Sequence, residues 1–113
     1  MPDYMVVLTT TNSQDLANTL ADDLVRNSVA ACVNIIPNIT SVYKWKGEVC
    51  RDTEWLLVIK TSAGHFERLR ERLRARHSYD VPEVIALPVV AGDAAYLNWL
   101  TESIGPPPAP PSP

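Results

Sequence analysis

The densest group of side chains able to do chemistry lies in the segment HSYDVPE, from His77 to Glu83. It holds one imidazole, one phenol and two carboxylates within seven residues, between a predicted helix and a predicted strand. A loop at such a place can present a binding site. A structural interpretation is equally open, with Tyr79 as a packing anchor, Asp80 as a turn former and Glu83 as the partner of a nearby cation.

Lys60 is a further candidate, because it ends an apolar row. In EWLLVIK the strand face that carries Leu56 and Val58 continues to Lys60. Its ammonium group can reach past the strand end into water, or it can pair with Glu83 or with an anionic ligand. The side chains that we group as the candidate lining of a ligand cleft are Lys60, Tyr79, Asp80, Glu83 and Trp45.

The residues that could bind a metal ion are scattered along the chain. No CxxC, HxxxH or HExxH spacing occurs, so no preformed zinc site is indicated. A metal site would have to be assembled from separated residues or across subunits, and His77 with a sulfur ligand from elsewhere would suit copper. Cys32 lies in an apolar strand, where a free thiol is expected, although a disulfide with Cys50 stays open.

Several functional classes are not indicated. GxSxG, P-loop and GxGxxG motifs are missing, and a hydrolase using His77 as a base would lack an activated nucleophile, so we expect no enzyme. A net charge of −3 and arginines that alternate with Glu67 and Glu71 along a helix predict no nucleic-acid partner. The start MPDYMVVLTT has no basic leader and no long apolar run, so we expect a cytoplasmic protein without membrane contact.

The apolar pattern predicts seven elements in the order β-α-β-β-α-β-α. Strands are expected over residues 4–10 and 83–91, a long hairpin over 30–61, and helices over 14–28, from Ser62 to near His77, and after Asp93. Two βαβ crossovers interleaved with a hairpin give an α+β, ferredoxin-like fold with both crossover helices on one face. We assign residues 1–104 to this domain and 105–113, which contain six prolines, to an extended, disordered tail.

The hairpin is too long for the rest of the domain. Pro37 predicts a bend or bulge in its first arm, and Lys46-Gly47 supplies its turn. Residues 35–45 alone would extend about 35 Å, at roughly 3.3 Å per residue. The helix over 14–28 would reach only about 22 Å. The hairpin should therefore project beyond its own domain.

Two apolar surfaces then need a cover. The far half of the hairpin carries Val42, Tyr43, Trp45, Val49 and Trp55, a large patch for a monomer to expose. The sheet face away from the helices is apolar as well, and Pro88 indicates an edge or a bulge in the fourth strand. Both surfaces predict an oligomer. The residues that we expect at or near subunit contacts are Tyr43, Trp45 and Trp55.

The sequence resembles one protein family from Tyr4 to about Ile104. The segments that carry the resemblance are VVLTT, LVRNSVAACVNIIPNITSVYKWKGEV, LLVIKT, HSYDVPEVIALPV and GDAAYLNWL. They are similar, in order and spacing, to the divalent-cation-tolerance proteins of the CutA family. The resemblance implies a ferredoxin-like fold and a homotrimer similar to the signal-transducing PII proteins, in which the long hairpin pairs with a neighbouring subunit.

The resemblance also implies a function linked to tolerance of copper and other divalent cations. The ligands proposed in the family are a cysteine at the end of the first strand and histidines just before the VPE motif. Thr9 stands at the cysteine position here and Arg76 at one histidine position, so His77 is the remaining candidate metal ligand. The leading hypothesis is a non-enzymatic trimer that responds to divalent metal and binds Cu²⁺ or another divalent cation, with no cofactor needed for folding. The alternative is a PII-like sensor with a small-molecule cleft between subunits.

Overall fold

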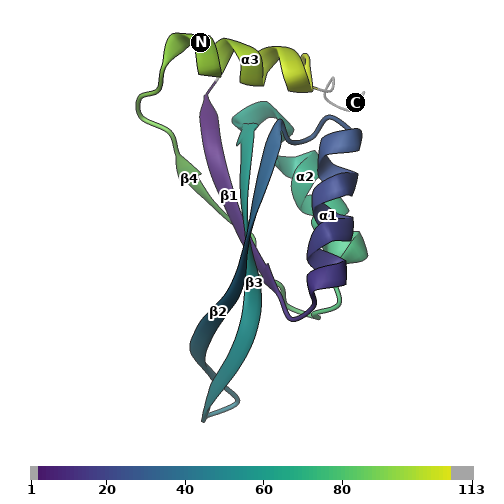
Figure 1. The fold of residues 1–113 in the computed structure, drawn as a ribbon, viewed down its shortest axis with the longest axis vertical. Coiled ribbons are helices and arrows are strands. Elements are labelled where there is room, and N and C mark those ends of the chain that lie inside the picture. The colour runs from purple at the N-terminus through teal and green to yellow at the C-terminus, as the bar shows by residue number, and fades with distance from the viewer. Residues whose placement is uncertain (1–2, 108–113) are drawn as a thin grey trace, which may run out of the picture.

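One four-stranded antiparallel sheet organises the computed structural model, which describes residues 3–107 (Figure 1). The elements in chain order are β1 (Tyr4–Thr11), α1 (Gln14–Arg26), β2 (Cys32–Trp45), β3 (Glu48–Ser62), the 3-10 helix η1 (Ala63–His65), α2 (Phe66–Arg76), β4 (Ile85–Pro88) and α3 (Ala94–Ile104). The strand order β2-β3-β1-β4 confirms the ferredoxin-like prediction. None of the helices in the described range is long and apolar enough to cross a membrane.

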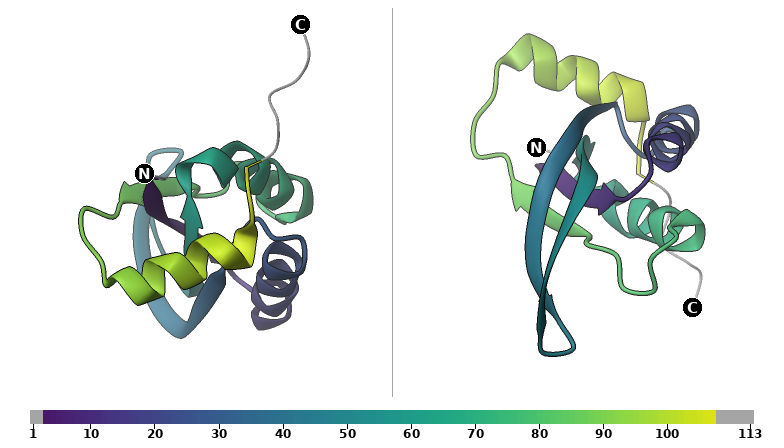
Figure 2. Two further views of the ribbon diagram at one scale, coloured as in Figure 1. Left: turned by 90° about the horizontal axis from the view of Figure 1, so that it is seen from above. Right: turned by 60° about the horizontal axis from the view of Figure 1, so that its bottom comes forward.

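Helices α1 and α2 cover the same face of the sheet, and the main core lies between them and the strands (Figure 2). The largest fully buried apolar side chains of this core are Leu20, Leu24, Leu57, Ile59, Leu69 and Leu73. The Ser13 hydroxyl accepts a hydrogen bond from the Leu16 amide and caps α1, which begins at Gln14 as the sequence predicts. The main core therefore forms within one chain.

The start of the second helix differs from the prediction. Ser62 precedes η1 rather than α2, and its hydroxyl makes no capping bond. It lies 2.7 Å from Nδ1 of His65, and α2 begins only at Phe66. The end of α2, with His77 as its C-cap residue, agrees with the prediction.

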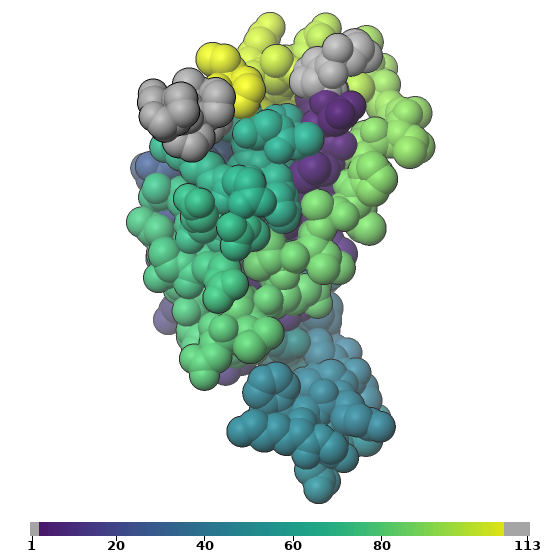
Figure 3. Space-filling model, turned by 180° about the vertical axis from the view of Figure 1, so that it is seen from behind, coloured from purple at the N-terminus to yellow at the C-terminus, as the bar shows by residue number. Residues whose placement is uncertain are grey.

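The hairpin of β2 and β3 projects beyond the domain, as its length predicts (Figures 1 and 3). The pairing of β3 with β1 ends at Trp55 and Thr11, so the residues nearer the tip pair only with the opposite arm. The turn has two residues, Lys46 and Gly47, both with positive φ, which is the geometry of the type I′ turn. The register shift that the sequence predicts at Pro37 is present.

Trp55 does not belong to the exposed patch, and that part of the sequence prediction was wrong. It is partly buried and packs against the main core, because it lies opposite Thr11, where β1 still covers β3. The other four members, Val42, Tyr43, Trp45 and Val49, are exposed. A subunit contact at Trp55 stays a prediction.

The sheet face opposite α1 and α2 also carries apolar side chains. No helix in the described part of the same chain covers most of this face, which we call the open face. Val6, Val58 and Leu87 lie on this open face, whereas Val7 and Leu57 point toward α1 and α2. The β4 strand is shorter than the predicted 83–91 and ends at Pro88, on the edge of the sheet. Helix α3 crosses only one end of the molecule (Figure 2).

The predicted tail begins directly after α3. Its first residues are ordered against the domain: Pro106 and Pro107 line a hollow beside His65, and a Cβ on Gly64 would lie 2.8 Å from Cβ of Pro107. The glycine thus permits this close approach. Residues 108–113 lie outside the described part of the chain, so the extended tail stays a prediction for them.

A bidentate ion pair ties α1 to α2. Asp23 accepts hydrogen bonds from Nε and Nη2 of Arg72 at 2.9 and 2.8 Å, and Nε of Arg76 lies 3.2 Å from its Oδ1. The hydrogen bond from Arg72, helped by the charge of both arginines, lowers the pKa of Asp23 against the opposing effect of burial. The expected helix-surface pair of Glu67 and Arg70 is also present, at 2.8 Å.

Replacing Asp23 with Asn should lower the free energy of unfolding at pH 7 by about 1 kcal/mol. Because the pKa of Asp23 is lower in the folded than in the unfolded chain, its contribution is present above the reference value of about 3.9 and is lost as the pH falls through the folded value. Urea unfolding of both proteins at pH 7 and pH 3, at one protein concentration, measures the difference. Glu67→Gln, at an exposed pair, is the control and should cost less. Equal differences at the two pH values would contradict the ion-pair assignment.

Candidate functional site

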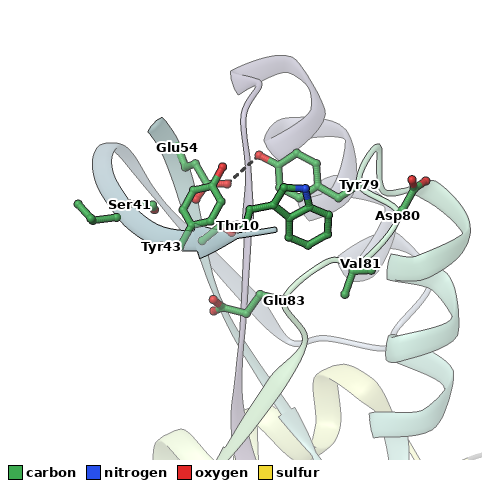
Figure 4. Close-up of a pocket in the computed structure, with 10 residues that line it drawn as sticks. Thr10, Ser41, Tyr43, Glu54, Tyr79, Asp80, Val81 and Glu83 are labelled. Carbon is green, nitrogen blue, oxygen red and sulfur yellow. Dashed lines mark hydrogen bonds between the residues drawn. The ribbon is translucent and has the colours of Figure 1, made fainter. Parts of the chain in front are cut away.

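A cleft of about 580 Å³ lies between the projecting half of the hairpin and the loop after α2 (Figure 4). We call it the hairpin cleft. Its lining residues are Thr10, Ser41, Val42, Tyr43, Trp45, Glu54, Tyr79, Asp80, Val81 and Glu83. Four of the five residues that the sequence groups as a ligand cleft, namely Trp45, Tyr79, Asp80 and Glu83, are therefore brought together.

The β2 side chains reach the hairpin cleft because of the register shift. Ile36 pairs with Leu56 and Ile39 pairs with Glu54, so β2 has one more residue than β3 in this interval. The shift moves the odd-numbered residues of β2, including Tyr43 and Trp45, to the sheet side on which Glu54 lies. The cleft is thus built on the same side as the open apolar face.

Glu54 and Tyr79 join the hairpin to the loop. The Tyr79 hydroxyl donates a hydrogen bond of 2.7 Å to Oε2 of Glu54, which is only 7% exposed (Figure 4). Burial and then this hydrogen bond raise the pKa of Tyr79. Tyr79 therefore remains a neutral donor to the Glu54 side chain.

Tyr43 makes the corresponding contact on the exposed side. Its hydroxyl donates to Oδ2 of Asp52 on the facing strand. This hydrogen bond raises the pKa of Tyr43 to about 12, with smaller contributions from desolvation and then from neighbouring charges. Both phenols are held by carboxylates, so their rings have defined positions beside the cleft.

His77 holds the loop in place rather than lining the cleft. Its Nδ1 lies 3.1 Å from the Tyr79 amide, which can only donate, so Nδ1 accepts. In the neutral imidazole Nε2 then carries the proton and donates to the carbonyl oxygen of Thr10 at 2.8 Å. Both ring nitrogens are engaged, and a metal ion at His77 would have to displace one of these bonds.

Lys60 does not line the hairpin cleft of a single chain, and its place in a cleft between subunits stays a prediction. It pairs in the sheet with Val6 and Cys32, and its ammonium group contacts the amide oxygen of Asn34. Glu54 is six residues farther along β3, a distance of roughly 20 Å in an extended strand. Within one chain Lys60 therefore does not reach the hairpin cleft, and of the two interpretations that the sequence left open, pairing with an anionic ligand stays a prediction for the assembled subunits.

Residues 3–107 contain no group of three or more His, Cys, Asp and Glu side chains placed to hold one ion. Thr9, at the family's cysteine position, is fully buried on the helix side of β1, and Cys32 and Cys50 are free thiols.

Sequence reasoning missed Glu54 as a residue of the site. A usable signal was present: Glu54 precedes the apolar run WLLVIK, and strand alternation places it on the same face as Leu56 and Val58. A carboxylate in such a row needs a partner, and Tyr79 supplies it. Thr10 and Ser41 carried no comparable signal.

Comparison with known proteins agrees with this architecture. The model of the CutA1 divalent ion tolerance protein family matches residues 5–103. The chain belongs to this family. The divalent-cation tolerance protein CutA of Thermus thermophilus is 50% identical over 100 residues, covering 88% of this chain and 97% of the relative.

Other CutA proteins extend the match in sequence and in structure. The chloroplastic CutA protein of Arabidopsis thaliana is 48% identical over 99 residues, which make up 88% of this chain and 54% of that protein. The solved structure of the divalent cation tolerance protein from Thermus thermophilus has a TM-score of 0.88 at 49% identity, covering 90% of this chain and 99% of that one. The CutA fold is thus shared over nearly the whole described chain.

Replacing Tyr79 with Phe should lower the free energy of unfolding by about 1–3 kcal/mol, because the buried Glu54 carboxylate loses its donor. Thermal and urea unfolding of the two proteins, at one protein concentration, test this. Tyr43→Phe is the matched control, since its hydroxyl also bonds a carboxylate but at an exposed position. A cost no larger than that of the control would show that the buried hydrogen bond does not hold the loop.

Proposed function

We propose that this CutA-family chain is a non-enzymatic homotrimer that acts in divalent-cation tolerance, with the hairpin cleft as its cation-binding region. The observation that carries the proposal is the charge of the lining: Glu54, Asp80 and Glu83 contribute carboxylates, and no Lys, Arg or His is among the lining residues of the described chain. Such a surface attracts cations and repels anions. The family match supplies the link to divalent cations.

The metal that we propose is Cu²⁺ or another divalent cation, held between subunits. Carboxylate oxygens suit hard divalent ions, whereas copper gains most from nitrogen or sulfur donors. Asp80 and Glu83 lie on the exposed loop, where a second subunit can approach. We accordingly propose that these two carboxylates bind the ion and that His77 positions their loop.

The trimer is supported by two apolar surfaces that a single chain leaves uncovered. The open face exposes Ile85 and Leu87, and the hairpin exposes Val42, Trp45 and Val49. Contiguous apolar surface of this kind favours association. Because the hairpin cleft shares the open side of the sheet, a neighbouring subunit would border it. We propose the cytoplasm as the place of action, supported by the two free thiols.

Calorimetric titration with Cu²⁺ in a non-coordinating buffer tests the metal site. Asp80→Asn combined with Glu83→Gln should weaken binding by about tenfold or more, because two charged ligands are removed. His77→Gln should leave the affinity within about twofold while lowering the melting temperature, since only the loop anchor changes. A large loss of affinity in His77→Gln with an intact double variant would make His77 the ligand and reject the carboxylate site.

Light scattering coupled to size-exclusion chromatography tests the trimer. Leu87→Glu places a charge on the open face and should convert a trimer into monomers, because an unpaired buried charge is costly. Val25→Glu is the control, since Val25 is an exposed apolar residue of α1, away from that face. A wild-type protein that elutes as a monomer, or a Leu87→Glu protein that stays trimeric, would refute this arrangement.

A further inference from the structure

The hairpin cleft combines aromatic side chains with negative charge. Tyr43 and Trp45 come from β2 and Tyr79 from the loop, so three aromatic residues from two segments line one cavity. Figure 4 shows the Tyr79 hydroxyl joined to the Glu54 carboxylate by a hydrogen bond, with the labelled Tyr43 drawn from the hairpin. Faces of tyrosine and tryptophan attract cations through the ring quadrupole, most strongly where water is excluded.

Glu54 gives this cavity a fixed charge at its inner wall. It is 7% exposed and lines the cleft, and Tyr79 donates one hydrogen bond to it. A carboxylate has about four acceptor positions in total. Glu54 therefore keeps acceptor capacity for a ligand that carries a positive charge, and Glu83 adds a second carboxylate on the loop side.

The remaining lining of the hairpin cleft also suits an organic cation. Val42 and Val81 add apolar surface beside the three aromatic residues. A divalent metal ion gains nothing from such surface, because it holds its water strongly. An alkylated ammonium group is weakly hydrated and can contact the rings and the carboxylate together. The volume of about 580 Å³ lies within the range typical of small-molecule sites.

From these contacts we infer that the hairpin cleft binds the alkylammonium group of a small organic molecule between Tyr43, Trp45 and Tyr79, with Glu54 as its counter-ion. The inference rests on the cation preference in the proposed function, but it names a different ligand. The inference has two contributions that can be tested separately: the aromatic rings contact the alkyl groups, and Glu54 pairs with the positive charge.

The test uses the ¹⁵N-labelled full chain in its native assembly, with tetramethylammonium chloride as the probe at constant ionic strength. The indole N–H signals of Trp45, Trp55 and Trp99 report on the cleft, the core and α3 respectively. The Trp45 signal should shift saturably, and the other two should not. tert-Butanol, which is similar in shape but uncharged, should produce no saturable shift.

Two variants separate the contributions of the rings and the charge. Glu54→Gln keeps an acceptor for the Tyr79 hydroxyl and should weaken tetramethylammonium binding by about tenfold. Trp45→Leu should weaken it to a similar extent, followed by the shift of backbone amides in the loop. The matched controls are Glu67→Gln and Trp99→Leu, whose side chains are exposed outside the cleft and should leave binding unchanged.

The outcomes distinguish this inference from the proposed function. If the Trp45 signal stays in place, or if tert-butanol shifts it as strongly as the cation, the alkylammonium site is rejected. Cu²⁺ binding that still depends on Asp80 and Glu83 would in that case leave the proposed function intact. If tetramethylammonium binds and Cu²⁺ does not, the inference holds and the metal proposal falls.

Discussion

One extra residue in β2 determines which side chains the hairpin presents to the cleft. Ile36 faces Leu56 and Ile39 faces Glu54, so β2 gains a residue on β3 between these pairs. Without that residue the strict alternation would place Val42 and Lys44, rather than Tyr43 and Trp45, on the sheet side of Glu54. Pro37 has no amide hydrogen to place in a ladder, and Asn38 has a φ of 57°, a value that asparagine tolerates. The register shift in β2 therefore determines which side chains line the hairpin cleft.

The two faces of the sheet differ in what packs against them. The side facing α1 and α2 holds the main core, which reaches along β3 as far as Trp55, where β1 also ends. Beyond that level the hairpin has no layer of its own chain to pack against. The open apolar face and the hairpin cleft both lie on the opposite side of the sheet. Association of chains and binding of a cation are therefore proposed on adjacent parts of one surface.

The loop after α2 is held in place by His77 and Tyr79, two side chains that the sequence suggests as candidates for binding a metal ion or a ligand. Both ring nitrogens of His77 form hydrogen bonds, one with the Thr10 carbonyl and the other with the Tyr79 amide. The Tyr79 hydroxyl donates a hydrogen bond to Glu54. A buried polar group without a hydrogen-bond partner destabilises the fold, and these groups already have partners within the chain. The side chains left to meet a ligand are the carboxylates and the aromatic faces. Within one chain, a basic residue such as Lys60 is excluded simply by its distance along β3.

The sequence by itself determined the features that depend on neighbouring residues. The order of elements, the caps at Ser13 and Asp93 and the turn at Lys46-Gly47 follow from apolar periodicity, capping chemistry and backbone preference, all of which act over a few residues. Only the tertiary structure decided that Trp55 is a core residue and that Glu54 meets Tyr79 across 25 positions of sequence. Those contacts depend on strand register and on the path of the loop, which are settled by packing between distant segments. The local sequence therefore indicates that Glu54 needs a partner but does not identify Tyr79 as that partner.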